Sequence, residues 1–155
     1  GNIQAQDDNA AILAALERHR VRAMLFPAGL IAASPDNLAL VRAWGDAGHA
    51  IGNHTYNHQA LSQSDTATYL ADVQQAQTLL HGLPGWCPRL RFPYLDEGAD
   101  QAQHDQVIQW LAQHGYGVAP VTIALQDWED TQRYQQLQQA GAQAEADASA
   151  ELRQR

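Results

Sequence analysis

Two histidines four residues apart, His54 and His58, lie in the stretch GHAIGNHTYNHQAL, directly after a short apolar segment that ends in glycine and asparagine. On a helical turn, positions four apart face the same side with Cβ atoms about 6 Å apart, so both imidazoles could reach one divalent ion. The spacing therefore permits a metal site. Permission alone is weak evidence, because the chain has seven histidines in all and surface histidines are common.

The other five histidines have simpler explanations. Three fall in the last turn of a predicted helix, where an imidazole can interact with free carbonyl groups: His19, His81 and His114. The remaining two are expected at the surface: His49 and His104. His54 and His58 differ because they follow a predicted strand at its carboxyl end, which is where α/β folds assemble their sites.

The residue after the first histidine of the pair excludes one class of metal enzyme. A metalloprotease of the HExxH type carries a glutamate there as general base, whereas position 55 is Thr55. A base for a metal-bound water must therefore come from another part of the chain.

The elements that would position the pair alternate between helices and short apolar strands. Helices are predicted at about residues 8–20, 34–45 and 62–82, and another one ends near Gly115. Strands are predicted at residues 21–29, 49–53, 89–92 and 116–125, with a loop at 83–88. Because the connections are too long for hairpins, the strands should be parallel and covered by helices, which predicts an α/β barrel or open sheet.

Composition supports one globular domain spanning residues 1–155. The chain is 45% hydrophobic and only 17% charged, as ordinary folded domains are. Its formal charge of -8 argues against a nucleic-acid partner or an anionic membrane surface, and no apolar run is long enough to span a membrane. Cys87 is the single cysteine and has no partner within the chain for a disulfide. The sequence does not indicate an oligomeric state.

The C-terminal segment, residues 132–155, is rich in Gln and Ala. Tyr134 and Leu137 form its clear inner-face pair, so we expect a solvated helix or a frayed tail.

Two stretches resemble a known family. GHAIGNHTYNH resembles the second motif of NodB-type polysaccharide deacetylases, carbohydrate esterase family four, in which HSxxH or HTxxH follows a Gly-His-x-Ile-Gly-Asn lead-in. RLRFPY resembles the third motif, RxPY, through Arg91, Pro93 and Tyr94.

A third stretch, ALQDW, resembles the fourth motif, DxxDW, through Asp127 and Trp128, with Ala124 at its first acidic position. The resemblance covers residues 10 to about 130 in the order of the family. It implies a distorted (β/α) barrel of the polysaccharide deacetylase type, incomplete in this chain.

The first and last motifs of the family are not clearly present. The first is an apolar strand ending in TFDDG that supplies the base and the third metal ligand, and Asp7 and Asp8 are the only nearby acidic pair. These two aspartates are either that motif or, as we favour, the cap of a helix. The last motif, a leucine followed by the general-acid histidine, is missing. We expect a fragment trimmed at both ends.

The resemblance implies a divalent ion, most often zinc, held by an aspartate with His54 and His58. Such an ion lowers the pKa of a bound water and polarises the acyl oxygen. Thr55 would brace the loop, Arg91 would orient the base carboxylate and keep it ionised, and the backbone amide of Tyr94 would stabilise the oxyanion. The alternatives are an arginine paired at a strand end for Arg91 and an aromatic wall for Tyr94.

Asp127 and Trp128 receive roles from the same resemblance. Asp127 would pair with the general-acid histidine, and Trp128 would contact the acetyl methyl group, so that Trp128 and Tyr94 would both bind substrate. The alternative for Asp127 and Trp128 is a helix cap followed by a core indole.

The resemblance implies hydrolysis of N- or O-acetyl groups on a carbohydrate, in a periplasmic or secreted protein. The first alternative is a catalytically inactive NodB-like module that binds glycan or metal. The second is a structural α/β domain with accidental histidines. Residues 1–155 alone are expected to be nearly inactive, because two histidines without a carboxylate bind an ion weakly.

Overall fold

The computed structural model describes residues 3–125, 127–139, 141 and 153. The chain forms two compact units, Gly1–Pro120 and Val121–Arg155. The first unit contains the sheet and most of the helices, and the second contains α6 (Asp127–Gln139).

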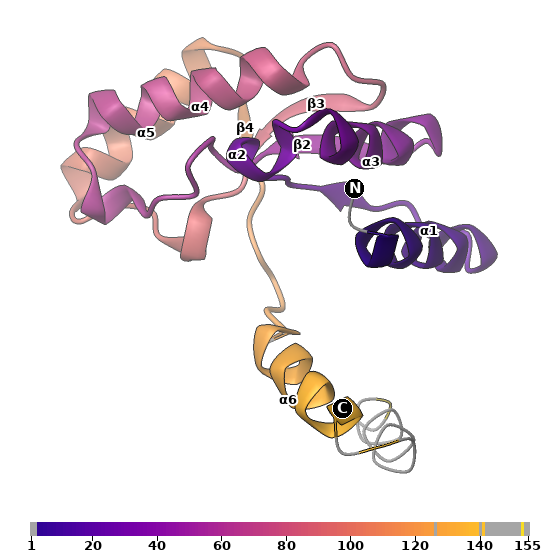
Figure 1. The fold of residues 1–155 in the computed structure, drawn as a ribbon. Helices are drawn as coiled ribbons and strands as arrows, with labels where there is room; N and C mark the ends of the chain where they lie inside the picture. Colours follow the sequence, from indigo (N-terminus) through magenta and orange to yellow (C-terminus); the bar gives the residue numbers. More distant parts are fainter. Residues whose placement is uncertain (1–2, 126, 140, 142–152, 154–155) are drawn as a thin grey trace. The chain divides into compact units, whose positions relative to one another are not determined.

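The centre of the first unit is a four-stranded sheet in which all neighbouring strands are parallel (Figure 1). Its strands follow the order β1 (Met24–Leu25), β2 (Ala50–Asn53), β3 (Trp86–Leu90) and β4 (Gly117–Val118). The prediction of a parallel α/β fold is therefore confirmed.

The strand lengths differ from the prediction. The first and last strands have two residues each, although apolar runs of nine and ten residues were expected to form them. Residues 86–88, expected as loop, form the start of β3. The Ile51 amide of β2 donates to the Gly85 carbonyl at 2.8 Å, and Ile51 pairs with Trp86, so strand pairing begins as soon as the turn ends.

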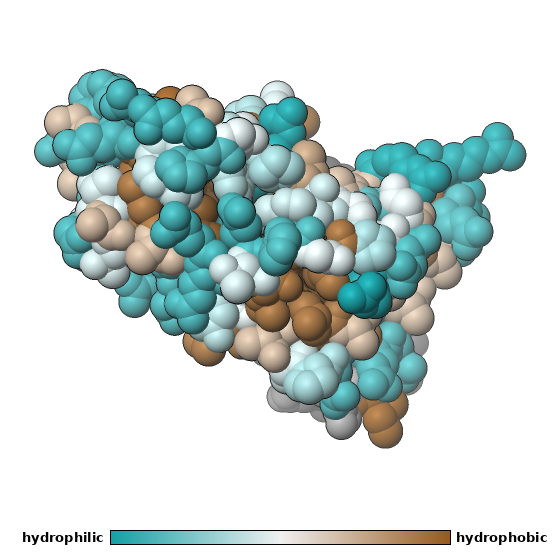
Figure 2. Space-filling model, turned by 90° about the horizontal axis from the view of Figure 1, so that it is seen from above, coloured by the Kyte–Doolittle hydropathy of each residue, from teal (hydrophilic) through white to brown (hydrophobic). Residues whose placement is uncertain are grey.

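One long helix precedes the first strand, and three others connect the strands. They are α1 (Ile3–Arg18), α3 (Pro35–Asp46), α4 (Thr66–Leu80) and α5 (Gln101–Gln113). Shorter helical segments are α2 (Gly29–Ala32), η1 (Leu61–Gln63) and η2 (Pro93–Leu95). α3 and α4 contact β2, while α5 contacts β4 and α4 (Figure 1). Seen from the side of α4 and α5, most surface residues are hydrophilic (Figure 2), as expected for helices that bury one face.

Capping decides where two of these helices start. Ser34 accepts a hydrogen bond from the Asn37 amide, so α3 begins where the sequence predicted. Asp65 accepts from the Thr68 amide, so α4 begins at Thr66 rather than at the predicted serines.

The prediction for α1 was wrong at its start. The helix begins at Ile3, and Asp7 and Asp8 lie inside it rather than at its N-terminal cap or at the end of a strand. Gln4 donates to Asp8 across one helical turn at 2.7 Å, and the preceding Gln and Ala residues favour helix, which explains the earlier start.

Two groups of buried side chains hold the helices on the sheet. One surrounds β3, α4 and α5: Leu61, Tyr69, Val73, Leu90, Phe92, Val107, Leu111 and Tyr116. The other lies between β2, α3 and the end of α4: Ala32, Val41, Ile51, Leu80 and Leu83. Ile51 and Leu90 are both 0% exposed, so the middle of the sheet is fully covered.

The second unit is described through α6. This helix begins at Asp127, five residues before the predicted solvated segment, and Tyr134 is half-buried in it. The Leu137 side chain and most of residues 140–155 lie outside the described residues. Within the part that is described, no helix combines the length and the apolar character needed to span a bilayer.

Gly45 allows α3 to lie directly against the turn that precedes β3. A Cβ at this position would meet the Pro84 carbonyl oxygen at 1.8 Å, whereas a Cβ at Gly82 would meet nothing within 4 Å. We predict that Gly45→Ala lowers the free energy of unfolding by about 1–3 kcal/mol and that Gly82→Ala changes it by less than about 0.5 kcal/mol. Urea denaturation of both variants checks this, and equal effects would contradict the close contact.

Candidate functional site

The carboxyl ends of β2 and β3 bring the central residues of the site together. Asn53 ends β2 and pairs with Leu90, which ends β3. The next residues, His54 and Arg91, therefore leave the sheet side by side, and the Arg91 amide donates to the Asn53 carbonyl at 3.0 Å. The sequence correctly placed His54 at the carboxyl end of a parallel strand.

The imidazoles of His54 and His58 converge. Their Nε2 atoms lie 3.1 Å apart, and the ring centroids are 4.7 Å apart. His54 Nδ1 lies 2.7 Å from the Arg91 carbonyl oxygen. Because a carbonyl only accepts, Nδ1 carries the proton and the Nε2 lone pair of His54 faces His58. A carbonyl in this place is a usual partner of a metal-binding histidine.

This spacing suits two ligands of one ion. Two nitrogens at the zinc–nitrogen distance of about 2.0–2.1 Å in tetrahedral geometry lie roughly 3.3 Å apart. The observed 3.1 Å is close to that value. Because Nδ1 of His54 carries its proton, the 3.1 Å contact is also the length of a hydrogen bond in which His58 Nε2–H donates to His54 Nε2.

The loop between the histidines is not the helical turn that the sequence argument assumed. Residues 54–58 are irregular, and both Thr55 (φ 60°) and His58 (φ 56°) adopt left-handed backbone conformations. Such a conformation is uncommon for a β-branched residue such as threonine. The Thr55 hydroxyl accepts from the His58 amide at 3.0 Å, which is the contact that the predicted bracing role of Thr55 requires.

Asn53, the last residue of β2, holds the start of this loop through buried hydrogen bonds. It was not singled out from the sequence. It is 0% exposed; its Nδ2 donates to the Val73 carbonyl at 2.9 Å and to the Tyr116 hydroxyl at 3.0 Å. Its Oδ1 accepts from the Thr55 amide at 2.8 Å. An uncharged polar residue at the end of a buried strand was the available signal.

Arg91 has a buried nitrogen without a partner. Its guanidinium lies over the Phe26 ring, 4.8 Å from the centroid. Its Nε is buried and makes no hydrogen bond to any described residue. A buried donor left unpaired costs about 1–3 kcal/mol, and pairing at the strand end, the alternative for Arg91, does not satisfy this donor within the described residues.

Tyr94 lies at the rim of the site. Its ring centroid is 4.8 Å from that of His58, and the residue is 72% exposed. Tyr94 and Leu95 both have a φ of 57°, directly after the buried Pro93. The aromatic contact with His58 is present, while the role of the Tyr94 amide stays a prediction.

The remaining predicted site residues are Asp127, Trp128, Asp7 and Asp8. Asp127 and Trp128 begin α6 in the second unit, and their side chains lie outside the described residues, so their roles stay predictions. Asp7 and Asp8 lie within α1. Throughout the residues that the structure describes, no three His, Cys, Asp or Glu side chains form a group that could hold an ion.

A cavity of about 570 Å³ opens beside the two imidazoles. Apart from His54, His58 and Asn37, its walls are apolar: Ala5, Phe26, Pro27, Ala28, Ile31, Ala32, Leu40 and Val41. The arrangement offers nitrogen ligands next to an apolar space, which suits a small ligand with one polar and one apolar part.

Burial sets the charge state of His54. Loss of water around the ring lowers its pKa, the hydrogen bond to the Arg91 carbonyl opposes this, and the positive charges of His58 and Arg91 lower the pKa further. The imidazole is therefore kept neutral, which is the form that binds metal ions.

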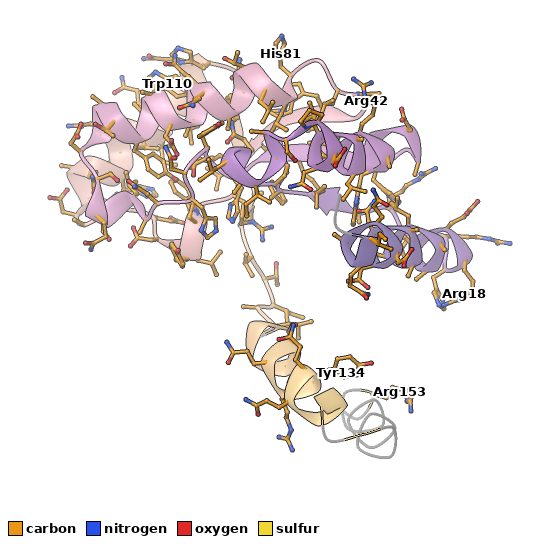
Figure 3. All side chains as sticks on the ribbon, viewed as in Figure 1. Arg18, Arg42, His81, Trp110, Tyr134 and Arg153 are labelled. Atoms are coloured by element: carbon orange, nitrogen blue, oxygen red, sulfur yellow. The ribbon has the colours of Figure 1, made fainter. Side chains whose placement is uncertain are left out.

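The other histidines mostly follow the prediction. His81 Nδ1 lies 3.1 Å from the Gln77 carbonyl at the end of α4, and His114 Nδ1 lies 2.8 Å from the Trp110 carbonyl at the end of α5. The His81 ring points away from the fold (Figure 3). His49 was wrongly expected at the surface: it is 5% exposed, its ring packs near Trp44, and its Nδ1 accepts from the Ala23 amide next to β1.

Comparisons with known proteins concern the sequence and the fold of this chain. Residues 3–119 match a family model described as polysaccharide deacetylase. A peptidoglycan-N-acetylglucosamine deacetylase of Bacillus cereus is 28% identical over 119 residues, which make up 76% of this chain and 40% of that protein. The chain thus spans well under two thirds of that relative.

Solved structures show the same fold. A family 4 carbohydrate esterase from Streptomyces lividans, in complex with acetate, has a TM-score of 0.66 and 29% identity over 79% of this chain and 60% of that one. A family 4 pseudoenzyme from Bacillus anthracis has a TM-score of 0.68 and 19% identity over 84% of this chain and 45% of that one. The second likeness concerns the fold alone.

Asn53 is predicted to be essential for stability. Replacing it with leucine, which has a similar volume, leaves the Thr55 amide without its buried acceptor and removes the bonds to the Val73 carbonyl and the Tyr116 hydroxyl, of which the hydroxyl still donates to Gln77. We expect Asn53→Leu to lower the free energy of unfolding by about 3 kcal/mol or more. Asn37→Ala, which removes a hydrogen bond to the Ile31 carbonyl nearer the surface, should cost about 1 kcal/mol. Urea denaturation distinguishes the two, and a tolerated leucine would contradict the anchoring role.

Proposed function

The chain belongs to the polysaccharide deacetylase family. From this premise we propose that the protein hydrolyses N- or O-acetyl groups on a carbohydrate with the help of a divalent ion. The observation that carries the proposal is the convergence of His54 and His58 Nε2 at 3.1 Å, with His54 Nδ1 fixed by the Arg91 carbonyl.

Zinc is the ion that these ligands favour, because imidazole nitrogens suit it and its tetrahedral geometry matches the spacing. When bound, such an ion acidifies a water molecule and polarises the acyl oxygen. His54 and His58 would hold it through their Nε2 atoms. The family pattern adds a carboxylate ligand and a general base, and no such group is found beside the pair among the described residues.

Arg91 is proposed to bind and orient the base carboxylate. Its buried Nε has no partner among the described residues, and a guanidinium fork is suited to a carboxylate in a fixed direction. A positive charge beside the base also keeps the carboxylate ionised, which a proton acceptor requires.

Residues at the rim of the site are proposed to bind the substrate. Tyr94 would offer its backbone amide to the developing oxyanion and its exposed ring to the sugar. Trp128 would contact the acetyl methyl group, and Asp127 would pair with a general-acid histidine. The apolar cavity beside the imidazoles supports an acyl group as the part of the substrate that is bound there.

The names of the relatives support an acetylated carbohydrate as the substrate class. The similar Bacillus cereus protein is a peptidoglycan-N-acetylglucosamine deacetylase, and the Streptomyces lividans esterase was solved with acetate. The alternative function is a module that binds glycan or metal without turnover, and acetate release separates the two.

The first test is acetate release from acetylated chitin, peptidoglycan and xylan fragments by the complete gene product. Activity should disappear on chelation and return with Zn²⁺, because both imidazoles act through the ion. His54→Ala and His58→Ala should each lower kcat/KM by about 10²-fold or more, whereas the outward-facing His81→Ala should match the wild type. Zinc and glycan binding without acetate release would favour the inactive module.

Arg91 gives a second prediction, in which activity and stability separate. Arg91→Met keeps the side-chain stem but removes the unpaired Nε, so the free energy of unfolding should stay within about 1 kcal/mol of the wild type. The kcat of the complete gene product should fall on the order of 10²-fold, because the base loses its orientation. Acetate release and urea denaturation measure the two effects, and an active Arg91→Met variant would exclude the proposed role.

A further inference from the structure

We propose that Asp72, in the middle of α4, is a positioning residue that holds the loop between His54 and His58 so that the two imidazoles face each other. Nothing in the sequence motifs points to Asp72, and it does not touch either imidazole. The expected effect of Asp72 on ion binding rests on the proposed function, whereas its effect on the loop conformation does not.

The Asp72 carboxylate accepts three hydrogen bonds from two consecutive loop residues. Oδ2 accepts from the Tyr56 amide at 2.9 Å and from the Asn57 amide at 2.9 Å. Oδ1 accepts from Asn57 Nδ2. Hydrogen bonds to a carboxylate are roughly twice as strong as those between neutral groups, so these contacts fix the centre of the loop.

The backbone on either side of these two residues is strained. Thr55 and His58 have φ values of 60° and 56°, and such conformations persist only where the surroundings impose them. Residues 56 and 57 lie between the two strained positions. A carboxylate that holds their amides therefore prevents the loop from relaxing in a way that would turn the imidazoles apart.

Backbone hydrogen bonds from α2 also hold the loop. The Gly29 and Leu30 amides of α2 donate to the Thr55 and Tyr56 carbonyls at 2.9 and 2.8 Å. The loop thus has carbonyls held by α2 and amides held by α4. The Val73 carbonyl, next to Asp72 in the chain, accepts from Asn53, so two adjacent residues of α4 hold the loop and the strand end before it.

The part of α4 that carries Asp72 is packed in the core. Val73 is 0% exposed and Tyr69 is 2% exposed, so the helix is anchored in the core on either side of Asp72. Asp72 does not serve as a cap, because Asp65 already caps this helix by accepting from the Thr68 amide and hydroxyl. Aspartate is a poor residue for a helix interior, so its place there is explained by the loop.

The experiment compares Asp72→Ala with Asp65→Ala in the full chain. Asp65→Ala removes a carboxylate from the same helix without touching the loop, so it is the matched control. The first readout is metal-free: NMR contacts between the His54 and His58 rings and the hydrogen exchange of the Tyr56 and Asn57 amides. Asp72→Ala should lose the ring contact and exchange these amides at least about tenfold faster, while Asp65→Ala should do neither.

The second readout is a Zn²⁺ titration followed by the resonances of both histidines. Asp72→Ala should weaken Zn²⁺ binding by about 10–100-fold, as loss of a supporting group around a metal ligand does, and Asp65→Ala should leave it unchanged. Retention of the ring contact in Asp72→Ala, or an equal loss of Zn²⁺ affinity in Asp65→Ala, would overturn the proposal.

Asp72→Asn is a second variant that keeps the shape of the side chain. Its neutral oxygen can still accept from both backbone amides, but more weakly, so amide exchange and the Zn²⁺ dissociation constant should rise by about two- to tenfold. Wild-type values in this variant would contradict the role of the carboxylate. If wild-type Zn²⁺ titration leaves both histidines unmoved, the proposed function fails, while the metal-free ring contact still decides the role of Asp72.

Discussion

The site depends on the parallel pairing of β2 and β3 at their carboxyl ends. This pairing places the Arg91 carbonyl 2.7 Å from His54 Nδ1, and that single hydrogen bond determines which ring nitrogen carries the proton. With Nδ1 protonated, the Nε2 lone pair of His54 faces Nε2 of His58. Arg91 thus contributes to the site through its backbone carbonyl, in addition to the role proposed for its guanidinium.

Uncharged polar residues make the hydrogen bonds that hold the backbone around this contact. Asn53 is fully buried and satisfies groups of the loop, of α4 and of Tyr116, so it ties the strand end to two other elements. Thr55 links the ends of the loop. A buried polar group of this kind is stable only when all its partners are present, and for that reason it also specifies one loop conformation.

Much of the fold follows from local signals in the sequence. The alternation of helices and strands, the cap at Ser34 and the position of His54 after a buried strand were all predictable, because each depends on neighbouring residues. The resemblance to polysaccharide deacetylases was confirmed by a family match over residues 3–119.

What the sequence could not provide depends on contacts between distant residues. Asp72 lies fifteen residues beyond Asn57, and only folding brings them together. The start of β3 at Trp86 is set by pairing with β2 rather than by its own composition. The two imidazoles converge as the sequence argument expected, but through strained backbone at Thr55 and His58 rather than through helical spacing.

The central claim is that His54 and His58 bind one ion together. The most direct test is a crystal structure of the complete gene product grown with Zn²⁺, with the ion located by its anomalous scattering. The claim requires one zinc ion at about 2.0–2.1 Å from Nε2 of both residues, with His54 Nδ1 still donating to the Arg91 carbonyl. A zinc ion bound elsewhere, or one that contacts only one of the two imidazoles, would contradict it.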